Sequence, residues 1–255
     1  MNDQPLLTER RERILLITLN RPDARNAVNL AMAEGMAAAL DELDSDDGLS
    51  VGVIAGEGKG FSSGMDLKAF ATGERPWAED RGFAGIVQKP AEKPLVAAIE
   101  GFAVAGGLEI ALACDLIVAA KGAKLGVPEV KRGLVAAAGA LRELPRRLPA
   151  SIAMELALTG ETIIAERGAE LGLINRLAEP GQALEVALGL AQELAANAPL
   201  ALRASKRVLR DQWSWDDEAF WAKQGEITAP VFTSEDAIEG ATAFSEKRAP
   251  DWKGR

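Results

Sequence analysis

Short apolar runs separated by polar loops in the first half of the chain predict buried β-strands. The clearest runs are residues 14–19, 51–55, 94–99 and 114–119, and Arg21-Pro22 stops the first of them. An alanine-rich helix is predicted between the first two runs, ending near Asp44, with Asn29 as its N-cap. Residues 124–129 are expected to be a further extended piece, which ends in a carboxylate.

From about Ala137 onward the spacing of apolar residues is almost entirely helical. The expected helices are residues 137–147, 151–158, 165–171, 182–197, 200–213, 216–227 and 235–244, with one short strand at residues 174–177. Residues 80–88 also show helical spacing, whereas residues 70–77 contain Gly73 and Pro76 and predict a mobile loop. The recurrence of strand, loop and helix places the chain in the α/β class.

The C-terminal helical part carries most of the tryptophan. Trp213, Trp215, Trp221 and Trp252 are all but one of the tryptophans of the chain. This is more aromatic surface than a solvated tail needs, so we expect it to pack on the core or on another subunit.

Length, composition and charge narrow the class of protein. A chain of 255 residues with 48% hydrophobic content can form one large domain, or a domain with an appendage, around a sizeable core. The net charge of −9 gives a whole-chain nucleic-acid surface no electrostatic support. The N-terminus lacks an apolar signal region, and no run reaches the ~18 apolar residues of a membrane span. A cytoplasmic protein without membrane or nucleic-acid partners is therefore expected.

The chain contains no histidine and no tyrosine. This removes the commonest general base, the Ser-His-Asp triad and histidine-ligated metals, so we predict no metal centre. Acid–base catalysis then falls to carboxylates, lysine or the single cysteine, Cys114. We expect Cys114 to be a small buried hydrophobe in a reducing compartment.

Residues 101–115, GFAVAGGLEIALACD, join an apolar strand, a small-residue turn and a helix that carries one carboxylate. Gly106 and Gly107 allow close approach to the main chain, and a helix that begins there presents free N–H groups at its positive end. This is the arrangement of an oxyanion hole. Taken alone, Glu109 is better explained as a partner of the helix dipole, and Glu129 as a surface residue before a basic loop.

A second glycine-rich stretch, residues 56–64, leads towards a helix expected near Met65. Ser63 stands where the dinucleotide fingerprint requires glycine, and the Walker A spacing is absent too. This loop alone gives little support for a phosphate cradle.

Five segments in order resemble the crotonase, or enoyl-CoA hydratase, superfamily. They are NRPDARNA at residues 20–27, GFSSGMDLK at 60–68, the stretch at 101–115, VPE at 127–129 and FSEKR at 244–248. The resemblance covers nearly everything from Leu16 to Gly254. It implies a spiral of ββα units with a C-terminal helical region that builds trimers or dimers of trimers. The implied division is a core at residues 1–198 and an oligomerisation region at residues 199–255.

The resemblance also implies a site for acyl-CoA thioesters, with no separate cofactor because coenzyme A is part of the substrate. By position, the family's two oxyanion amides fall on the backbone N–H groups of Met65 and Gly106, and its two glutamates fall on Glu109 and Glu129. The implied reaction is reversible syn addition of water to a trans-2-enoyl-CoA, giving a 3-hydroxyacyl-CoA. Glu109 would activate the water and Glu129 would protonate the alpha carbon.

The coenzyme A contacts implied by the same resemblance are Arg25, Ser63, Asp66, Leu67, Lys68 and Lys247. The main chain around the first oxyanion loop would hold the adenine, with Arg25 close to the nucleotide end. Lys68 and, from a neighbouring subunit, Lys247 would meet phosphates. Each basic residue is also explained by an ordinary exposed surface position.

The chain departs from the family pattern after the second glutamate. Many hydratases have a Pro-Gly-x-Gly-Gly turn there, whereas residues 133–140 read GLVAAAGA, with alanine at the proline and at two of the glycines. We expect this change to affect acyl-chain preference and the positioning of Glu129. Lys131 and Arg132, just before the turn, either recognise a polar acyl group or are simply exposed.

Several activities stay open, because this superfamily runs different chemistries on one scaffold. Its isomerases and decarboxylases commonly lack one of the two glutamates, so the pair here favours hydration or dehydration. The alternatives are an enoyl-CoA isomerase, a dehydratase of a polar acyl-CoA, a thioester hydrolase and a non-catalytic acyl-CoA-binding scaffold.

Overall fold

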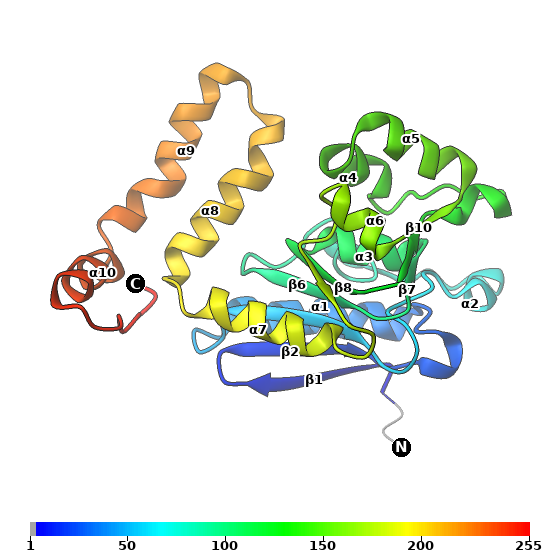
Figure 1. Cartoon of the computed structure of the whole chain (residues 1–255), viewed down its shortest axis with the longest axis horizontal. Helices are drawn as coiled ribbons and strands as arrows, with labels where there is room; N and C mark the ends of the chain where they lie inside the picture. Colours follow the sequence, from blue (N-terminus) through cyan, green and yellow to red (C-terminus); the bar gives the residue numbers. More distant parts are fainter. Residues whose placement is uncertain (1–3) are drawn as a thin grey trace.

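The computed structural model describes residues 4–255, apart from the side chain of Glu79, and is built around a six-stranded sheet (Figure 1). The strand order is β1-β2-β3-β6-β8-β11; β1 runs antiparallel to β2, and all other neighbours are parallel. The strands are β1 Leu6–Arg11, β2 Ile14–Leu19, β3 Val51–Gly56, β6 Leu95–Ile99, β8 Leu116–Ala120 and β11 Arg176–Ala178. The strands predicted near residues 14, 51, 94 and 114 are confirmed.

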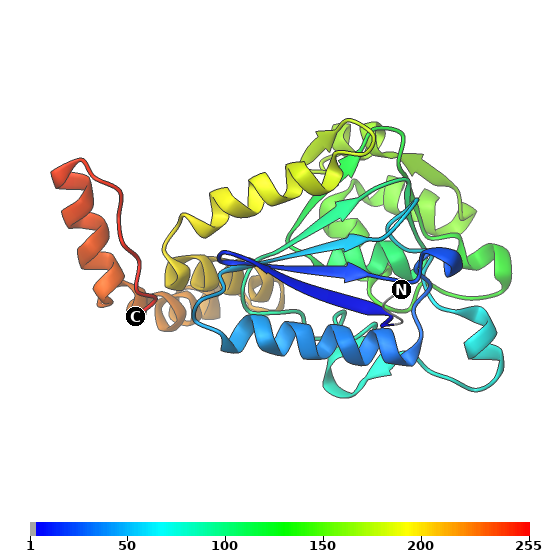
Figure 2. The same ribbon diagram turned by 90° about the horizontal axis from the view of Figure 1, so that it is seen from below.

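Both faces of this sheet are buried, which explains why its strands are continuously apolar rather than alternating. Ile14 and Leu16 of β2 pack in a cluster with helix α7 (Ala183–Ala195). Leu15 and Ile17 point the other way, into the larger core that includes helix α1 (Leu30–Ser45). Figure 2 shows α1 and α7 on opposite faces of the sheet.

Two strand–strand–helix units follow one another, β6–β7–α3 and β8–β9–α4. Their further elements are β7 Phe102–Val104, α3 Gly106–Ala113, β9 Lys124–Gly126 and α4 Ala140–Arg147. The first strand of each unit joins the large sheet, and the second joins a three-stranded sheet of order β10-β9-β7, completed by β10 (Thr162–Ile164). β7 and β9 are parallel neighbours, so each unit is displaced sideways from the one before it. This is the expected spiral of ββα units.

The remaining elements agree with the sequence pattern at most positions. They are α2 Leu67–Ala71, α5 Ala150–Thr159, α6 Ala165–Glu170, α8 Pro199–Asp211, α9 Asp217–Phe232, α10 Glu235–Glu246, the short strands β4 Trp77–Ala78 and β5 Gly82–Phe83, and the 3-10 helices η1 Pro22–Ala24, η2 Glu79–Arg81, η3 Pro128–Arg132 and η4 Gln212–Ser214. The cap of α1 is confirmed, because the Asn29 side chain accepts a hydrogen bond from the Met32 N–H (3.1 Å).

The helix predicted over residues 80–88 is wrong. This segment contains the end of η2, the strand β5 and a turn, and β5 pairs with β4. Gly82, Ala84 and Gly85 have φ values of 72°, 55° and 70°, which a right-handed helix excludes. A Cβ on Gly85 would lie 2.1 Å from the carbonyl oxygen of Ala33, so the turn needs glycine to approach α1. The apolar residues of this segment are spaced as in a helix because they are buried, and not because the segment is helical.

Helices α8 to α10 extend away from the sheet, as Figures 1 and 2 show. A buried lysine fastens α8 to the core: the Lys206 ammonium donates to the Asp115 carboxylate (2.6 Å) and to the Lys93 carbonyl (2.8 Å). The Trp252 indole N–H donates to the Ala196 carbonyl (2.8 Å), so the chain end returns towards α7.

Several large apolar side chains of these helices do not pack on the core of their own chain. Trp221, Phe232 and Phe244 are 73%, 79% and 88% exposed. Their packing on another subunit, and the division of the chain at residue 198, remain predictions.

Two further expectations concern chemistry outside the site. Cys114 is buried, and burial raises the pKa of its thiol to about 12, so the prediction that it is a buried residue is confirmed. Among the residues that the structure describes, no helix combines the length and apolarity required to cross a membrane.

Candidate active site

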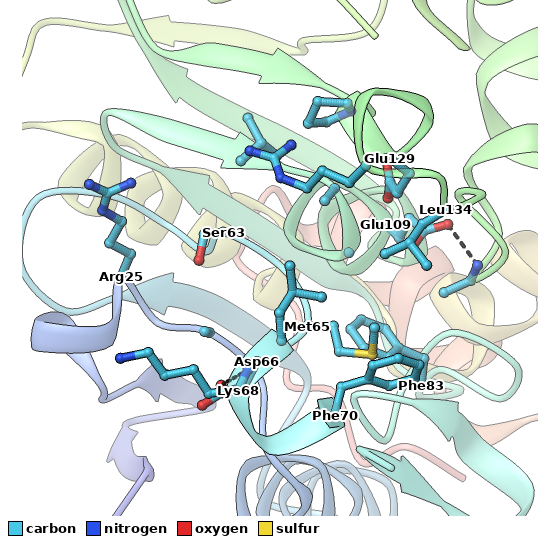
Figure 3. Close-up of a pocket in the computed structure, with 18 of the residues that line it drawn as sticks. Arg25, Ser63, Met65, Asp66, Lys68, Phe70, Phe83, Glu109, Glu129 and Leu134 are labelled. Atoms are coloured by element: carbon cyan, nitrogen blue, oxygen red, sulfur yellow. Dashed lines mark hydrogen bonds between the residues drawn. The ribbon is translucent and has the colours of Figure 1, made fainter. Parts of the chain in front are cut away.

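A cavity of about 730 Å³ lies among the loops after β2 and β3, the start of α3, and η3 with the turn that follows it (Figure 3). Its lining includes every predicted site residue except Lys247. These are Arg25, Ser63, Met65, Asp66, Leu67, Lys68, Gly106, Glu109 and Glu129. Lys247 follows α10 in the C-terminal part of the chain, and its predicted contact belongs to a neighbouring subunit, so it stays a prediction.

Met65 and Gly106 lie where two backbone segments meet. A Cβ on Gly64 would be 2.6 Å from the Gly106 nitrogen, which shows how closely the segments approach. Within residues 4–255, the N–H groups of Met65 and Gly106 donate to no protein acceptor. Gly106 begins α3, whose first amides have no partner inside the helix. Two unpaired donors at a cavity wall form the arrangement that stabilises an oxyanion.

The neighbours of these amides fix their direction. The Val28 N–H donates to the Gly64 carbonyl (2.8 Å) and the Asp66 N–H donates to the Val28 carbonyl (2.9 Å), so Met65 is held on both sides. Ala105, immediately before Gly106, adopts φ 53° and ψ −134°, a strained conformation for a residue with a Cβ. Backbone strain stored beside the Gly106 amide is typical of a functional site.

Asn26 supports the loop that carries Met65, a role that the sequence analysis missed although Asn26 lies in one of the quoted motifs. Its side chain is buried; Nδ2 donates to the carbonyls of Glu57 and Gly60 (both 2.9 Å), and Oδ1 accepts from the Arg21 N–H (2.9 Å). Its φ of 52° is a conformation that asparagine tolerates better than most residues. The loops after β2 and β3 are thereby joined.

We expect Asn26→Ala to lower the free energy of unfolding by about 2–4 kcal/mol, because three backbone groups, one in a buried and two in part-buried hydrogen bonds, lose their partner. Urea unfolding measures this change. Asn29→Ala removes an asparagine that caps only α1 and should cost about 1 kcal/mol. Equal losses in the two variants would contradict the role assigned to Asn26.

Glu109 is held by the turn after η3. It is 4% exposed, and its Oε1 accepts hydrogen bonds from the N–H groups of Ala138 (2.7 Å) and Ala140 (3.1 Å). Burial, with the nearby negative charge of Glu129, raises the pKa of Glu109 to about 7, and the two amide bonds oppose this rise. A carboxyl group with this pKa can accept or release a proton near neutral pH.

Glu129 follows Pro128 at the start of η3 and is 9% exposed. Its Oε2 is buried and has no hydrogen-bond partner in the described structure. Burial raises its pKa, while the positive charge of Arg132 acts in the opposite direction. Buried polar atoms without partners are rare, so this oxygen is available for a group that enters the cavity.

Stability should depend on pH through Glu109. Because folding raises the pKa of this carboxyl from 4.5 to about 7, its ionisation opposes folding. The contribution of Glu109 to the free energy of unfolding is therefore fully present below pH ~4.5 and decreases as the pH rises. Above pH ~7 about 3 kcal/mol of it has been lost. Glu109→Gln keeps an oxygen acceptor for the two amides and cannot ionise. We expect its stability advantage over the wild type to grow between pH 5 and pH 8, as measured by urea unfolding; a constant difference would contradict this.

The coenzyme A half of the predicted site is formed by main chain and by basic side chains. The N–H groups of Ser63 and Asp66 already donate to the Arg25 and Val28 carbonyls, so these two residues can offer a ligand only carbonyl oxygens from their main chain. The Asp66 carboxylate caps α2 and pairs with Arg21 (2.9 Å), so it too is occupied. Figure 3 shows Arg25 and Lys68 away from the two glutamates.

Comparisons with known proteins agree along the whole chain. A family model described as enoyl-CoA hydratase/isomerase matches residues 9–255. The chain is 37% identical to the 2,3-dehydroadipyl-CoA hydratase of Escherichia coli, over 98% of this chain and 99% of that one. It is 41% identical to the carnitinyl-CoA dehydratase of Salmonella typhi, over 95% of each. A crystal structure of an enoyl-CoA hydratase from Mycobacterium tuberculosis matches with a TM-score of 0.97 and 55% identity, covering 99% of this chain and 100% of that one.

The chain belongs to the enoyl-CoA hydratase/isomerase family. Membership confirms the crotonase superfamily and its fold, and it supports a crotonase-type enzyme. The relatives bear names for different acyl-CoA substrates, so the substrate is not given by membership.

Residues 133–140, where this chain departs from the family pattern, form the turn from η3 into the first residue of α4. The Leu134 N–H of this turn donates to the main-chain carbonyl of Glu129 (3.1 Å), and the effect of the alanine substitutions on the Glu129 side chain and on acyl-chain preference stays a prediction. The larger role of the turn is to supply both amide donors to Glu109, on either side of Gly139 with φ 114°. The alanine-rich turn therefore still forms a two-amide site for a carboxyl oxygen.

An aromatic wall of the crotonase-type site was missed from the sequence. Phe70, Trp77 and Phe83 line the cavity, and the rings of Trp77 and Phe83 meet edge to face with centroids 5.4 Å apart. Figure 3 shows Phe70 and Phe83 beside Met65. These residues lie in segments predicted as a loop and a helix; the two glycines at positions 82 and 85 were the available signal for a turn.

Proposed function

We propose that the protein is an enoyl-CoA hydratase, which adds water reversibly to a trans-2-enoyl-CoA and gives a 3-hydroxyacyl-CoA. One observation carries the proposal: two buried carboxyl groups and two unpaired backbone N–H groups line the same cavity. Binding alone needs no pair of buried carboxyl groups with raised pKa values, which argues against a non-catalytic scaffold.

The N–H groups of Met65 and Gly106 receive the thioester oxygen. Negative charge grows on this oxygen as the substrate becomes enolate-like, and preorganised donors stabilise the growing charge more than the starting carbonyl. Because both donors are main-chain groups, a side-chain change at Met65 should matter less than a change that moves its backbone.

Glu109 is the base. Two amides hold one of its oxygens, which leaves the other to accept a proton from water, and the hydroxyl oxygen then bonds to the beta carbon. The electron pair of the double bond moves towards the thioester, and the alpha carbon takes a proton from Glu129. Afterwards Glu109 is neutral and Glu129 is ionised. One proton therefore has to move from Glu109 to Glu129 before the next turnover. Two coupled carboxyls that share a proton suit this exchange.

We also propose that Arg25, Lys68 and the main chain of Ser63, Asp66 and Leu67 bind coenzyme A, since all line the same cavity. Lys247 would add a phosphate contact from a neighbouring subunit. The exposed aromatic residues of α9 and α10 support assembly through this region into trimers or dimers of trimers.

The decisive experiment incubates the purified protein with crotonyl-CoA and with longer trans-2-enoyl-CoAs and follows the absorbance of the conjugated thioester. Hydration removes the conjugation without releasing coenzyme A, whereas a thioester hydrolase releases a free thiol that a thiol reagent detects. Retention of the conjugated signal at every chain length excludes hydratase activity on this panel. Loss of signal with equivalent thiol release supports the hydrolase alternative.

A further inference from the structure

A basic residue beside Glu129 has no partner in the described part of the chain. Arg132 lines the cavity and is exposed to solvent, and its guanidinium makes no hydrogen bond or ion pair with any described residue. The preceding residue differs: the Lys131 ammonium pairs with Glu161 (2.5 Å), and Lys131 does not line the cavity. Of two adjacent positive charges, one is used by the fold and the other is free.

The backbone places Arg132 close to the reacting end. Both Glu129 and Arg132 belong to η3. With three residues per turn, a 3-10 helix brings residues three apart onto the same face. The charge of Arg132 acts on the Glu129 carboxyl, although the two form no ion pair. Arg132 is therefore near the unpaired Glu129 oxygen without satisfying it.

The surroundings indicate what a free guanidinium here can bind. Pro128, Leu134 and Val135, which are close to Arg132 in the sequence and line the same cavity, carry no charge. The acidic residue near it, Glu129, makes no ion pair with it. A guanidinium binds a carboxylate or a phosphate with two parallel hydrogen bonds. The whole chain carries a net charge of −9, so an unpaired cation that lines the site is not explained by a shortage of acidic residues.

We infer that Arg132 binds an anionic oxygen group of the acyl-CoA substrate, either a carboxylate on the acyl chain or a phosphate of coenzyme A. The inference rests on the proposed acyl-CoA site. The geometry favours the acyl carboxylate, because Arg25 and Lys68, the proposed phosphate contacts, lie away from Glu129 (Figure 3). Arg132 then selects acyl chains that end in a negative charge.

Calorimetric binding of three ligands separates the two sources. Hexanoyl-CoA and adipyl-CoA have acyl chains of equal length and differ in a terminal methyl or carboxylate, and free coenzyme A carries the phosphates alone. We expect Arg132→Gln to lower the affinity for adipyl-CoA by about 10- to 100-fold and the affinities for hexanoyl-CoA and free coenzyme A by less than about twofold. An equal loss for all three ligands assigns the anion to a phosphate. No loss for any ligand overturns the inference.

Lys131→Gln is the matched control, since it removes the same charge one residue away from a side chain that is already paired. It should change each affinity by less than about twofold, and losses equal to those of Arg132→Gln would reduce the effect to general electrostatics. These ligands have no double bond, so the test does not depend on turnover. If the wild-type protein binds these ligands but hydrates no enoyl-CoA, the proposed activity is contradicted and the inference about Arg132 still stands. A wild type that binds none of them overturns the acyl-CoA site and this inference with it.

Discussion

Glu129→Gln and Glu109→Gln are each expected to lower kcat for enoyl-CoA hydration by a factor on the order of 10²–10⁴, the range for loss of a positioned acid or base. Glutamine preserves the shape of the side chain but cannot transfer the proton. Both residues are buried, and the unpaired Oε2 of Glu129 and the amide-bound Oε1 of Glu109 show that the two are held differently. Steady-state kinetics with crotonyl-CoA measures the loss.

Binding supplies the control for these variants. Coenzyme A should bind both with affinities near that of the wild type, because its proposed contacts lie away from the glutamates. Full activity in both variants would contradict the catalytic roles proposed for Glu109 and Glu129. Loss of activity together with loss of coenzyme A binding would indicate a damaged site rather than missing proton transfer.

Gly64→Ala is expected to lower kcat by a factor on the order of 10²–10³ or more, because it obstructs the oxyanion donors. Gly64 has φ +87°, and a Cβ there would lie 2.6 Å from the Gly106 nitrogen and 3.0 Å from the Ala105 Cβ. The segments carrying Met65 and Gly106 would have to separate, and both amides would leave the thioester oxygen. Turnover and the melting temperature of the variant should be measured together.

Gly122→Ala separates obstruction from backbone strain. Gly122 has a similar φ of +77°, but an added Cβ would meet nothing within 4 Å, and this residue does not line the cavity. Both variants should lose stability through strain, by about 1 kcal/mol, while only Gly64→Ala should lose turnover. Comparable kcat values in the two variants would contradict an oxyanion hole at this contact.

The local pattern predicted much of the fold, and it failed where a distant contact decided the conformation. Residues 14–19 are apolar on both faces and were recognised as a buried strand. Residues 80–88 have helical spacing, yet Gly85 sits against the backbone of α1, an approach that no local pattern reports. The first strand, β1, was missed because Glu9, Arg10 and Arg11 are charged and because, among residues 4–255, it is an edge strand with β2 as its one neighbour.

The sequence by itself determined the family, the order of the main elements and the candidate site residues. Motifs and the spacing of apolar residues are local properties that can be read directly from the order of the amino acids. Only the tertiary structure decided what each group can do. Glu109 meets its amide partners across 29 and 31 residues, and that contact, with burial, sets its pKa. Lys131 and Arg132 look alike in the sequence, and only the tertiary structure shows that Glu161 pairs with Lys131 and leaves Arg132 without a partner among the described residues. Hydrogen bonds and desolvation depend on groups brought together by folding, and one-dimensional spacing carries no record of them.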